Sequence, residues 1–116
     1  TLPDTKETDG FINAKTLGMM KNTSMLMNVG RGNAIDEVAL ASAINSGMLG
    51  GAVLDVFASE PLAQESPLWD LPNVFITPHT AAKSVPEDIF DIFVENYRRY
   101  FEKAPLLSVV DFELGY

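Results

Sequence analysis

Three polar residues of this sequence, Arg31, Glu60 and His79, have side chains that could together act on a small anion. An arginine offers two parallel donors to a carboxylate, and an imidazole can give or take a proton near neutral pH. A carboxylate beside the imidazole favours its protonated form. His79 is the only histidine of the chain, so any histidine chemistry depends on it. Acid–base chemistry on a substrate that carries a carboxylate is open to this set of residues.

Each of these residues follows a short apolar run that predicts a β-strand. The runs are residues 25–29 before Arg31, residues 51–57 before Glu60, and residues 74–76 before His79. We expect the last run to be a buried strand that Thr77 and Pro78 bring to an end. Ligands bind at the carboxyl ends of parallel strands in open α/β sheets, so the three side chains are expected to meet there.

A strand, a helix and a second strand follow one another between residues 25 and 56, which predicts a crossover that joins parallel strands. Asp36 is expected to cap a helix over residues 37–46, and Gly47 to stop it. Residues 74–76 supply a third parallel strand. The predicted fold class is therefore α/β: the C-terminal part of a doubly wound parallel sheet, with about three strands and their helices, followed by a long C-terminal helix.

Two segments outside the strands carry weaker signals. Thr8 or Asp9 is expected to cap a short helix. The apolar side of that helix would be Phe11, Ile12 and Leu17. The polar loop over residues 58–71 contains Trp69, which could either pack in the core or form the wall of a pocket.

The glycines on both sides of Arg31 allow a tight turn and a close approach of the backbone to a ligand.

The longest predicted helix begins at a capping box formed by Ser84 and Glu87 and runs to about Lys103. It has an apolar stripe that is too wide for a lone surface helix. We expect this stripe to cover either the sheet or another domain. The stripe consists of Ile89, Phe90, Phe93, Val94, Tyr97, Tyr100 and Phe101.

Composition excludes several classes of function. The chain has 116 residues, which is one domain at most, and its net charge of −8 argues against a nucleic-acid or acidic-membrane partner. It has no cysteine and one histidine, which argues against disulfides and against a bound metal. No run reaches the length of a transmembrane helix and no signal peptide is evident, so a cytoplasmic location is expected.

Six short motifs follow one another over residues 1–82. They are Leu2-Pro3-x-Thr5-x-x-Thr8, Asn28-Val-Gly-Arg31-Gly32, Asp36-x-x-Ala39-Leu40, Leu54-Asp55-Val56-Phe57 with Glu60-Pro61, Ser66-Pro67-Leu68-Trp69, and Thr77-Pro78-His79. In this order and spacing they resemble the nucleotide-binding, Rossmann-type domain of the D-isomer-specific 2-hydroxyacid dehydrogenases. The Ser-Pro-Leu-Trp loop, the Pro-His-Thr-Ala-Ala segment and the ending Gly115-Tyr116 lean toward the glyoxylate and hydroxypyruvate reductase branch.

The resemblance implies reduction of a small 2-keto acid by hydride from NAD or NADP, or the reverse reaction. Arg31 matches the residue that clamps the substrate carboxylate and keto oxygen. His79 matches the acid that protonates the keto oxygen, and Glu60 the carboxylate that hydrogen-bonds the imidazole. The family's cofactor contacts match Pro3 and Thr8 beside the ribose, Val29, Gly30, Arg31 and His79 on the nicotinamide side, and Asp55 at the nicotinamide amide.

The sequence departs from the family pattern in one respect, because it contains no Gly-x-Gly-x-x-Gly turn for the cofactor phosphates. We therefore expect residues 1–82 to be the C-terminal part of the nucleotide-binding domain. Residues 83–116 would be a return helix and tail that pack on a substrate domain absent from this chain. The isolated chain is expected to bind cofactor poorly and to catalyse nothing measurable. Its open sheet edge and apolar helix favour a homo-oligomer.

Two other functions remain open at this point. One is a non-catalytic, NAD-sensing binding module of the corepressor kind, which resembles these dehydrogenases and can retain all three catalytic residue types. The other is a plain interaction domain in which Arg31, Glu60 and His79 are scattered over the surface. A separation of His79 and Glu60 well beyond about 6 Å would favour the second alternative.

Overall fold

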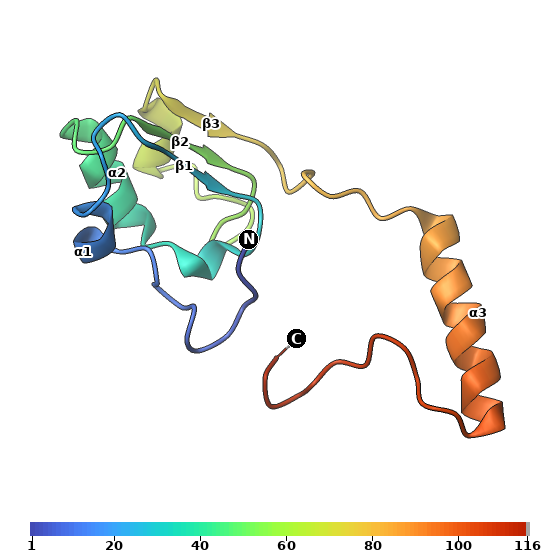
Figure 1. The fold of residues 1–116 in the computed structure, drawn as a ribbon. Helices are drawn as coiled ribbons and strands as arrows, with labels where there is room; N and C mark the ends of the chain where they lie inside the picture. The colour runs from blue at the N-terminus through green and yellow to red at the C-terminus, as the bar shows by residue number, and fades with distance from the viewer. Residues whose placement is uncertain (116) are drawn as a thin grey trace. The chain divides into compact units, whose positions relative to one another are not determined.

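A computed structural model describes residues 1–115 of the chain, and Tyr116, part of the Gly-Tyr ending noted above, lies outside the described residues. The chain divides into two compact units, Thr1–Ala81 and Ala82–Tyr116 (Figure 1). The first unit contains α1 (Ala14–Leu17), β1 (Met25–Asn28), the 3₁₀ turn η1 (Gly32–Ala34), α2 (Glu37–Asn45), β2 (Gly51–Leu54), the 3₁₀ turn η2 (Pro67–Asp70) and β3 (Val74–Ile76). The second unit contains the helix α3 (Pro86–Glu102).

The sheet of the first unit has three strands in the order β1-β2-β3, and both pairs are parallel. In the register of the sheet, Met27 lies opposite Val53, which in turn lies opposite Phe75. This arrangement confirms the predicted α/β class and the three parallel strands. Because the strands are parallel, the segments that follow them begin at the same edge of the sheet.

One face of the sheet packs on α1 and α2, which lie together on that side (Figure 1). The buried core there includes Leu17, Leu40, Ile44, Leu49, Ala52, Leu54 and Leu68. The side chains of Met27 and Phe75 point to the other face and are 65% and 59% exposed. The expectation of a buried strand at residues 74–76 is therefore wrong for Phe75, because β3 alternates between two faces of which only one is covered within this unit.

The first helix begins later than predicted. α1 is capped by Asn13, whose side chain accepts hydrogen bonds from Lys15 N and Thr16 N. Thr8 Oγ1 caps no helix: it accepts from Thr5 N at 3.0 Å and donates to Pro3 O at 2.6 Å, while Gly10 N and Ile12 N bond to Asn33 O and Ala34 O and keep the intervening segment out of a helix. Phe11 is 54% exposed. The capping box at Asn13 is complete, so it outweighs the weaker signal at Thr8 and Asp9.

The second helix follows the prediction closely. Asp36 caps α2 by accepting a hydrogen bond from Ala39 N at 2.9 Å. Two residues beyond the end of α2, Gly47 has φ +73°, the left-handed conformation that stops a helix. These signals are local, so the sequence is sufficient to place both ends.

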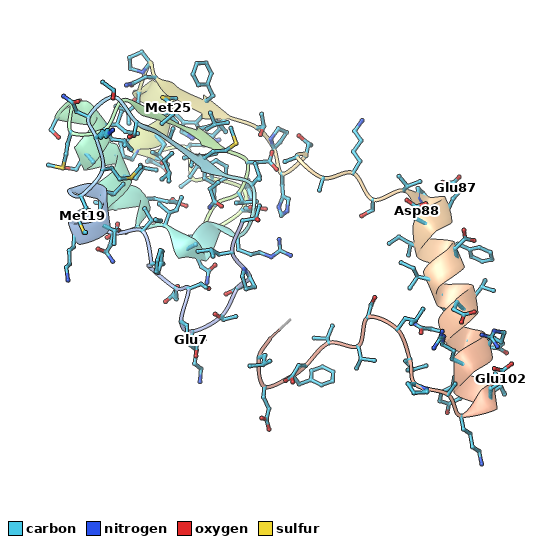
Figure 2. All side chains as sticks on the ribbon, viewed as in Figure 1. Glu7, Met19, Met25, Glu87, Asp88 and Glu102 are labelled. Carbon is cyan, nitrogen blue, oxygen red and sulfur yellow. The ribbon has the colours of Figure 1, made fainter. Side chains whose placement is uncertain are left out.

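The start of α3 departs from the prediction. Its N-cap is Val85, which makes no side-chain cap bond, and Pro86 occupies the first helical position. Ser84 lies one residue too early to cap, so the expected Ser84–Glu87 capping box does not form. Glu87 and Asp88 lie in the first turn, where negative charge favours a helix (Figure 2).

The second unit on its own buries none of the side chains of α3. Its tail folds back on the helix through Asn96, which donates to Leu107 O at 3.0 Å and accepts from Leu107 N at 2.7 Å. Hydrogen bonds from Arg98 and Arg99 lower the pKa of Glu95 to about 2.

No helix within residues 1–115 is both long and apolar enough to cross a bilayer.

Candidate active site

Arg31, Glu60 and His79 lie around one cavity. Arg31 follows β1, Glu60 follows β2 and His79 follows β3. All three line a cavity of about 280 Å³ at the carboxyl edge of the sheet. The remaining lining residues are Asp4, Gly32, Asn33, Val56, Phe57 and Ala58. The structure thus brings together a guanidinium, a carboxylate and an imidazole from three neighbouring strand ends.

Glu60 and His79 are directly hydrogen-bonded. His79 Nδ1 lies 2.8 Å from Glu60 Oε2, which contradicts the alternative in which these residues are scattered. An ionised carboxylate can only accept a hydrogen bond, so Nδ1 carries the proton of this contact. The hydrogen bond from His79 and a second one from Phe57 N lower the pKa of Glu60. Nε2 is left as the nitrogen that can exchange a proton with a ligand.

Asn28 holds the turn that carries Arg31. It is 7% exposed, and its side chain donates to Arg31 O at 2.9 Å and accepts from Gly30 N at 3.1 Å. Arg31 Nη1 donates to Gly30 O at 2.9 Å. Sequence reasoning missed the role of Asn28, although an asparagine at a strand end can form a turn by bonding to the backbone two residues further on, as it does here with Gly30 N.

Gly32 lets the segments after β1 and β2 come together. A Cβ at this position would lie 1.9 Å from the carbonyl carbon of Phe57. The sequence suggested that this glycine allows the backbone to approach a ligand, whereas the structure shows an approach to the protein's own backbone. No larger residue fits here without separating the loop of Arg31 from the loop of Glu60.

One side chain that the sequence did not single out, that of Glu37, supports a loop that lines the cavity. Glu37 Oε1 accepts a hydrogen bond from Ala58 N at 2.8 Å, which fixes the loop that leads to Glu60. Glu37 also lies in the first turn of α2, so its role as a loop anchor could not be separated from a helix signal.

Trp69 forms the wall of a second cavity, of about 300 Å³, that Glu60 and His79 also border. The indole is 50% exposed, and Nε1 donates to Ala63 O at 2.9 Å. Of the two alternatives left open for Trp69, the structure selects the pocket wall. Apolar side chains of Phe57, Pro61, Leu62, Ile76 and Pro78 make up most of the remaining lining.

Asp55 is 2% exposed and is bonded to the segment that follows β3. Its carboxylate accepts from the hydroxyl of Thr77, from Thr80 N at 2.9 Å and from Ala81 N at 2.9 Å. The hydrogen bond from Thr77 is the first cause that lowers the pKa of Asp55. The expected contact of Asp55 with a nicotinamide amide stays a prediction.

The other expected cofactor residues lie in two segments that touch. Thr8 Oγ1 donates to Pro3 O at 2.6 Å and so closes the loop at the start of the chain. Gly30 is buried, and a Cβ there would lie 2.9 Å from Leu2 N. Val29, beside it, is 37% exposed.

Within residues 1–115 no group of three or more His, Cys, Asp or Glu side chains is placed to hold a metal ion.

Comparison with known proteins identifies the family. Residues 1–81 match the family described as "D-isomer specific 2-hydroxyacid dehydrogenase, NAD binding domain". Glyoxylate/hydroxypyruvate reductase A of Klebsiella pneumoniae is 44% identical over 115 residues, which are 99% of this chain and 37% of that protein. The same enzyme of Photorhabdus laumondii is 43% identical, again over 99% of this chain and 37% of that protein.

Two solved structures extend the similarity to three dimensions. A D-isomer specific 2-hydroxyacid dehydrogenase of Xanthobacter autotrophicus, in complex with NADPH and MES, has a TM-score of 0.95 and 43% identity over 100% of this chain and 38% of that one. An NADPH-dependent glyoxylate/hydroxypyruvate reductase of Sinorhizobium meliloti, in complex with NADP and sulfate, has a TM-score of 0.93 and 39% identity over 99% of this chain and 38% of that one. The chain spans just over a third of the length of these relatives. It belongs to the D-isomer specific 2-hydroxyacid dehydrogenase family, and its residues 1–81 match the NAD binding domain of that family.

Proposed function

We propose that the complete gene product is an oxidoreductase that transfers hydride between NADH or NADPH and a small 2-keto or 2-hydroxy acid. Glyoxylate and hydroxypyruvate are the best candidate substrates, because the relatives named above reduce them according to their names. The observation that carries the proposal is the cavity in which Arg31, Glu60 and His79 meet. None of the relatives named above is described as a corepressor, so the comparisons give no support to the alternative of a non-catalytic, NAD-sensing binding module.

Arg31 is proposed to bind the substrate through its carboxylate. Arg31 lines a cavity of about 280 Å³, a size that suits a small acid. A planar guanidinium can hold a carboxylate with two parallel hydrogen bonds, which also orients the neighbouring keto group. The solved relatives were crystallised in complex with MES, which carries a sulfonate group, and with sulfate.

His79 is proposed to give its Nε2 proton to the keto oxygen during reduction and to take it back in the reverse direction. Glu60 holds the Nδ1 proton, so the imidazole keeps one orientation while Nε2 changes its protonation state. A bound nicotinamide cofactor supplies the hydride that reduces the keto carbon.

Seven residues are proposed to contact the nicotinamide and its ribose. They are Pro3, Thr8, Val29, Gly30, Arg31, Asp55 and His79. The donor set around the cavity fits this reactive end of the cofactor. It does not fit the phosphates, because the sequence has no glycine-rich turn to bind them. The solved relatives contain NADPH or NADP, which favours the phosphorylated form of the cofactor.

The proposed clamp predicts a specific defect in the variant Arg31→Lys. The lysine keeps the positive charge but loses the two-pronged donor, so we expect the KM for glyoxylate to rise about 10- to 100-fold. The KM for NADPH should change less than the KM for glyoxylate, because Arg31 is only one of several expected cofactor contacts. Steady-state kinetics of the complete gene product with glyoxylate and hydroxypyruvate measure both constants.

The matched control is Arg98→Lys, which changes an arginine of α3 that pairs with Glu95 and Glu102. This variant should keep the wild-type KM values. Failure of the unaltered protein to reduce glyoxylate, hydroxypyruvate or any acid of a broad 2-keto-acid panel would contradict the proposed function.

The apolar side of α3 is proposed to be covered by a substrate domain in the complete protein and to drive self-association of the 116-residue chain. Phe93, Tyr97 and Phe101 form a row of contacting rings, with centroids 6.0 Å and 4.9 Å apart, and each ring is at least 58% exposed. Exposed apolar surface of this extent favours association.

The cytoplasmic location expected from the sequence stays a prediction.

Sedimentation velocity of the 116-residue chain at micromolar concentration is expected to show a dimer or a larger oligomer. The double substitution Phe93→Ser and Tyr97→Ser should shift the distribution toward the monomer. The control Asp91→Ser changes a charged residue of the same helix and should leave it unchanged. A strictly monomeric unaltered chain would refute this proposal.

A further inference from the structure

Asp55 is the most buried charged side chain near the cavity, and the acid–base chemistry proposed above does not use it. It lies one residue beyond β2 and is 2% exposed. Burial of a carboxylate is unfavourable unless hydrogen bonds compensate for the lost hydration. The partners of Asp55 therefore indicate what its burial achieves.

All side-chain partners of Asp55 lie in the five-residue segment 77–81, which carries His79. The carboxylate accepts from the hydroxyl of Thr77 before the histidine, and from Thr80 N and Ala81 N after it, both at 2.9 Å. The main-chain oxygen of Asp55 accepts from His79 N at 2.9 Å. One residue thus binds the segment on both sides of the imidazole and at the histidine itself.

The backbone of His79 needs such support. It has φ +53°, in the left-handed region that residues with a Cβ rarely occupy. A conformation of this kind persists only where the surrounding contacts impose it. The direction in which the imidazole leaves the chain depends on this conformation, and so does its hydrogen bond to Glu60.

We propose that Asp55 is a positioning residue for His79: its buried carboxylate holds segment 77–81 in the conformation that places the imidazole against Glu60. The consequence for catalysis rests on the proposed function, in which His79 transfers a proton. A carboxylate suits this task because both of its oxygens accept. An asparagine offers one accepting oxygen and directs its NH₂ group at a backbone N–H.

The test uses Asp55→Asn in the complete gene product, with two readouts. The first is the kinetics of glyoxylate reduction, in which we expect kcat to fall on the order of 10- to 100-fold while the KM for glyoxylate stays near the wild-type value. The second is the ¹H–¹⁵N spectrum of the His79 imidazole, assigned by comparison with His79→Gln. In the unaltered protein it should show a single form protonated at Nδ1, and in Asp55→Asn a mixture of ring forms.

A second pair of variants keeps the proposal testable if Asp55→Asn does not fold. Thr77→Val removes one donor to Asp55 and should lower kcat and disturb the imidazole spectrum in the same direction. Thr77→Ser retains the hydroxyl and should restore both. The control for general destabilisation is Asp36→Ala, which removes the cap of α2 and should lower the Tm without moving either readout.

The outcomes separate the two proposals. An unaltered imidazole spectrum and kcat in Asp55→Asn, or in Thr77→Val where that variant alone folds, would overturn the positioning role. Lack of keto-acid reduction by the unaltered protein would overturn the proposed function. The imidazole spectrum would in that case still decide whether Asp55 positions His79.

Discussion

The variant His79→Gln is expected to reduce kcat for glyoxylate about 10²- to 10⁴-fold, which corresponds to roughly 3 to 5 kcal/mol of activation barrier. Glutamine can still form hydrogen bonds, but it cannot release a proton to the keto oxygen near neutral pH. The substrate carboxylate would still meet Arg31 across the same cavity. We therefore expect the KM for glyoxylate to stay within the wild-type range. Steady-state and single-turnover kinetics with NADPH measure both effects.

Titration of Glu60 gives an independent check of the same contact. The hydrogen bond from His79 is the largest cause that lowers the pKa of Glu60 below the usual value for a glutamate. A carboxyl group whose folded-state pKa is lowered stabilises the fold at pH values above its unfolded pKa, and this contribution is lost as the pH falls through the folded pKa. In His79→Gln the pKa of Glu60, followed by ¹³C NMR, should rise toward the usual value for a glutamate.

A kcat of His79→Gln close to that of the wild type would exclude His79 as the proton donor.

The variant Gly32→Ala is expected to lose both stability and activity. Its Cβ would lie 1.9 Å from the carbonyl carbon and 2.0 Å from the carbonyl oxygen of Phe57, so two backbone segments must move apart. We expect destabilisation of about 3 kcal/mol or more and a Tm lower by about 10 °C or more. The same movement separates Arg31 from Glu60, so kcat/KM should fall about 100-fold even where the fold persists. Thermal unfolding and kinetics of the complete gene product measure these effects.

Gly47→Ala is the matched control for this prediction. Gly47 has φ +73°, but no atom lies within 4 Å of a Cβ built there. The alanine should therefore cost only the left-handed backbone conformation, about 1 kcal/mol, and should leave kcat/KM unchanged. Gly32 does not have a left-handed φ, so a loss of stability in Gly32→Ala no larger than that in Gly47→Ala would show that the contact with Phe57 does not make Gly32 necessary.

The sequence by itself determined those features that depend on neighbours along the chain. Asp36 and Gly47 act within one helical turn, and they bound α2 as predicted. The short apolar runs and the helix between them imply parallel strands, because crossovers of this kind have one hand. That rule was enough to predict that Arg31, Glu60 and His79 emerge at the same edge of the sheet.

Where two local signals competed, the tertiary structure decided between them. The cap at Asn13 formed and the one at Thr8 did not, because Gly10 N and Ile12 N bond to Asn33 O and Ala34 O, more than 20 residues further along the chain, and keep the segment before Asn13 out of a helix. Phe75 belongs to an apolar run, yet it is 59% exposed because the covering helices lie on the other face of the sheet. Neither outcome is visible within a few residues of the position concerned.

The contacts that orient the site were decided only by the fold. Gly32 meets Phe57, and Asp55 bonds to residues 22 to 26 positions further along the chain. Such contacts depend on which segments become neighbours in space and on how closely their backbones approach. Sequence spacing identifies the chemical groups of this site, whereas their separation and orientation arise only once the strands are paired.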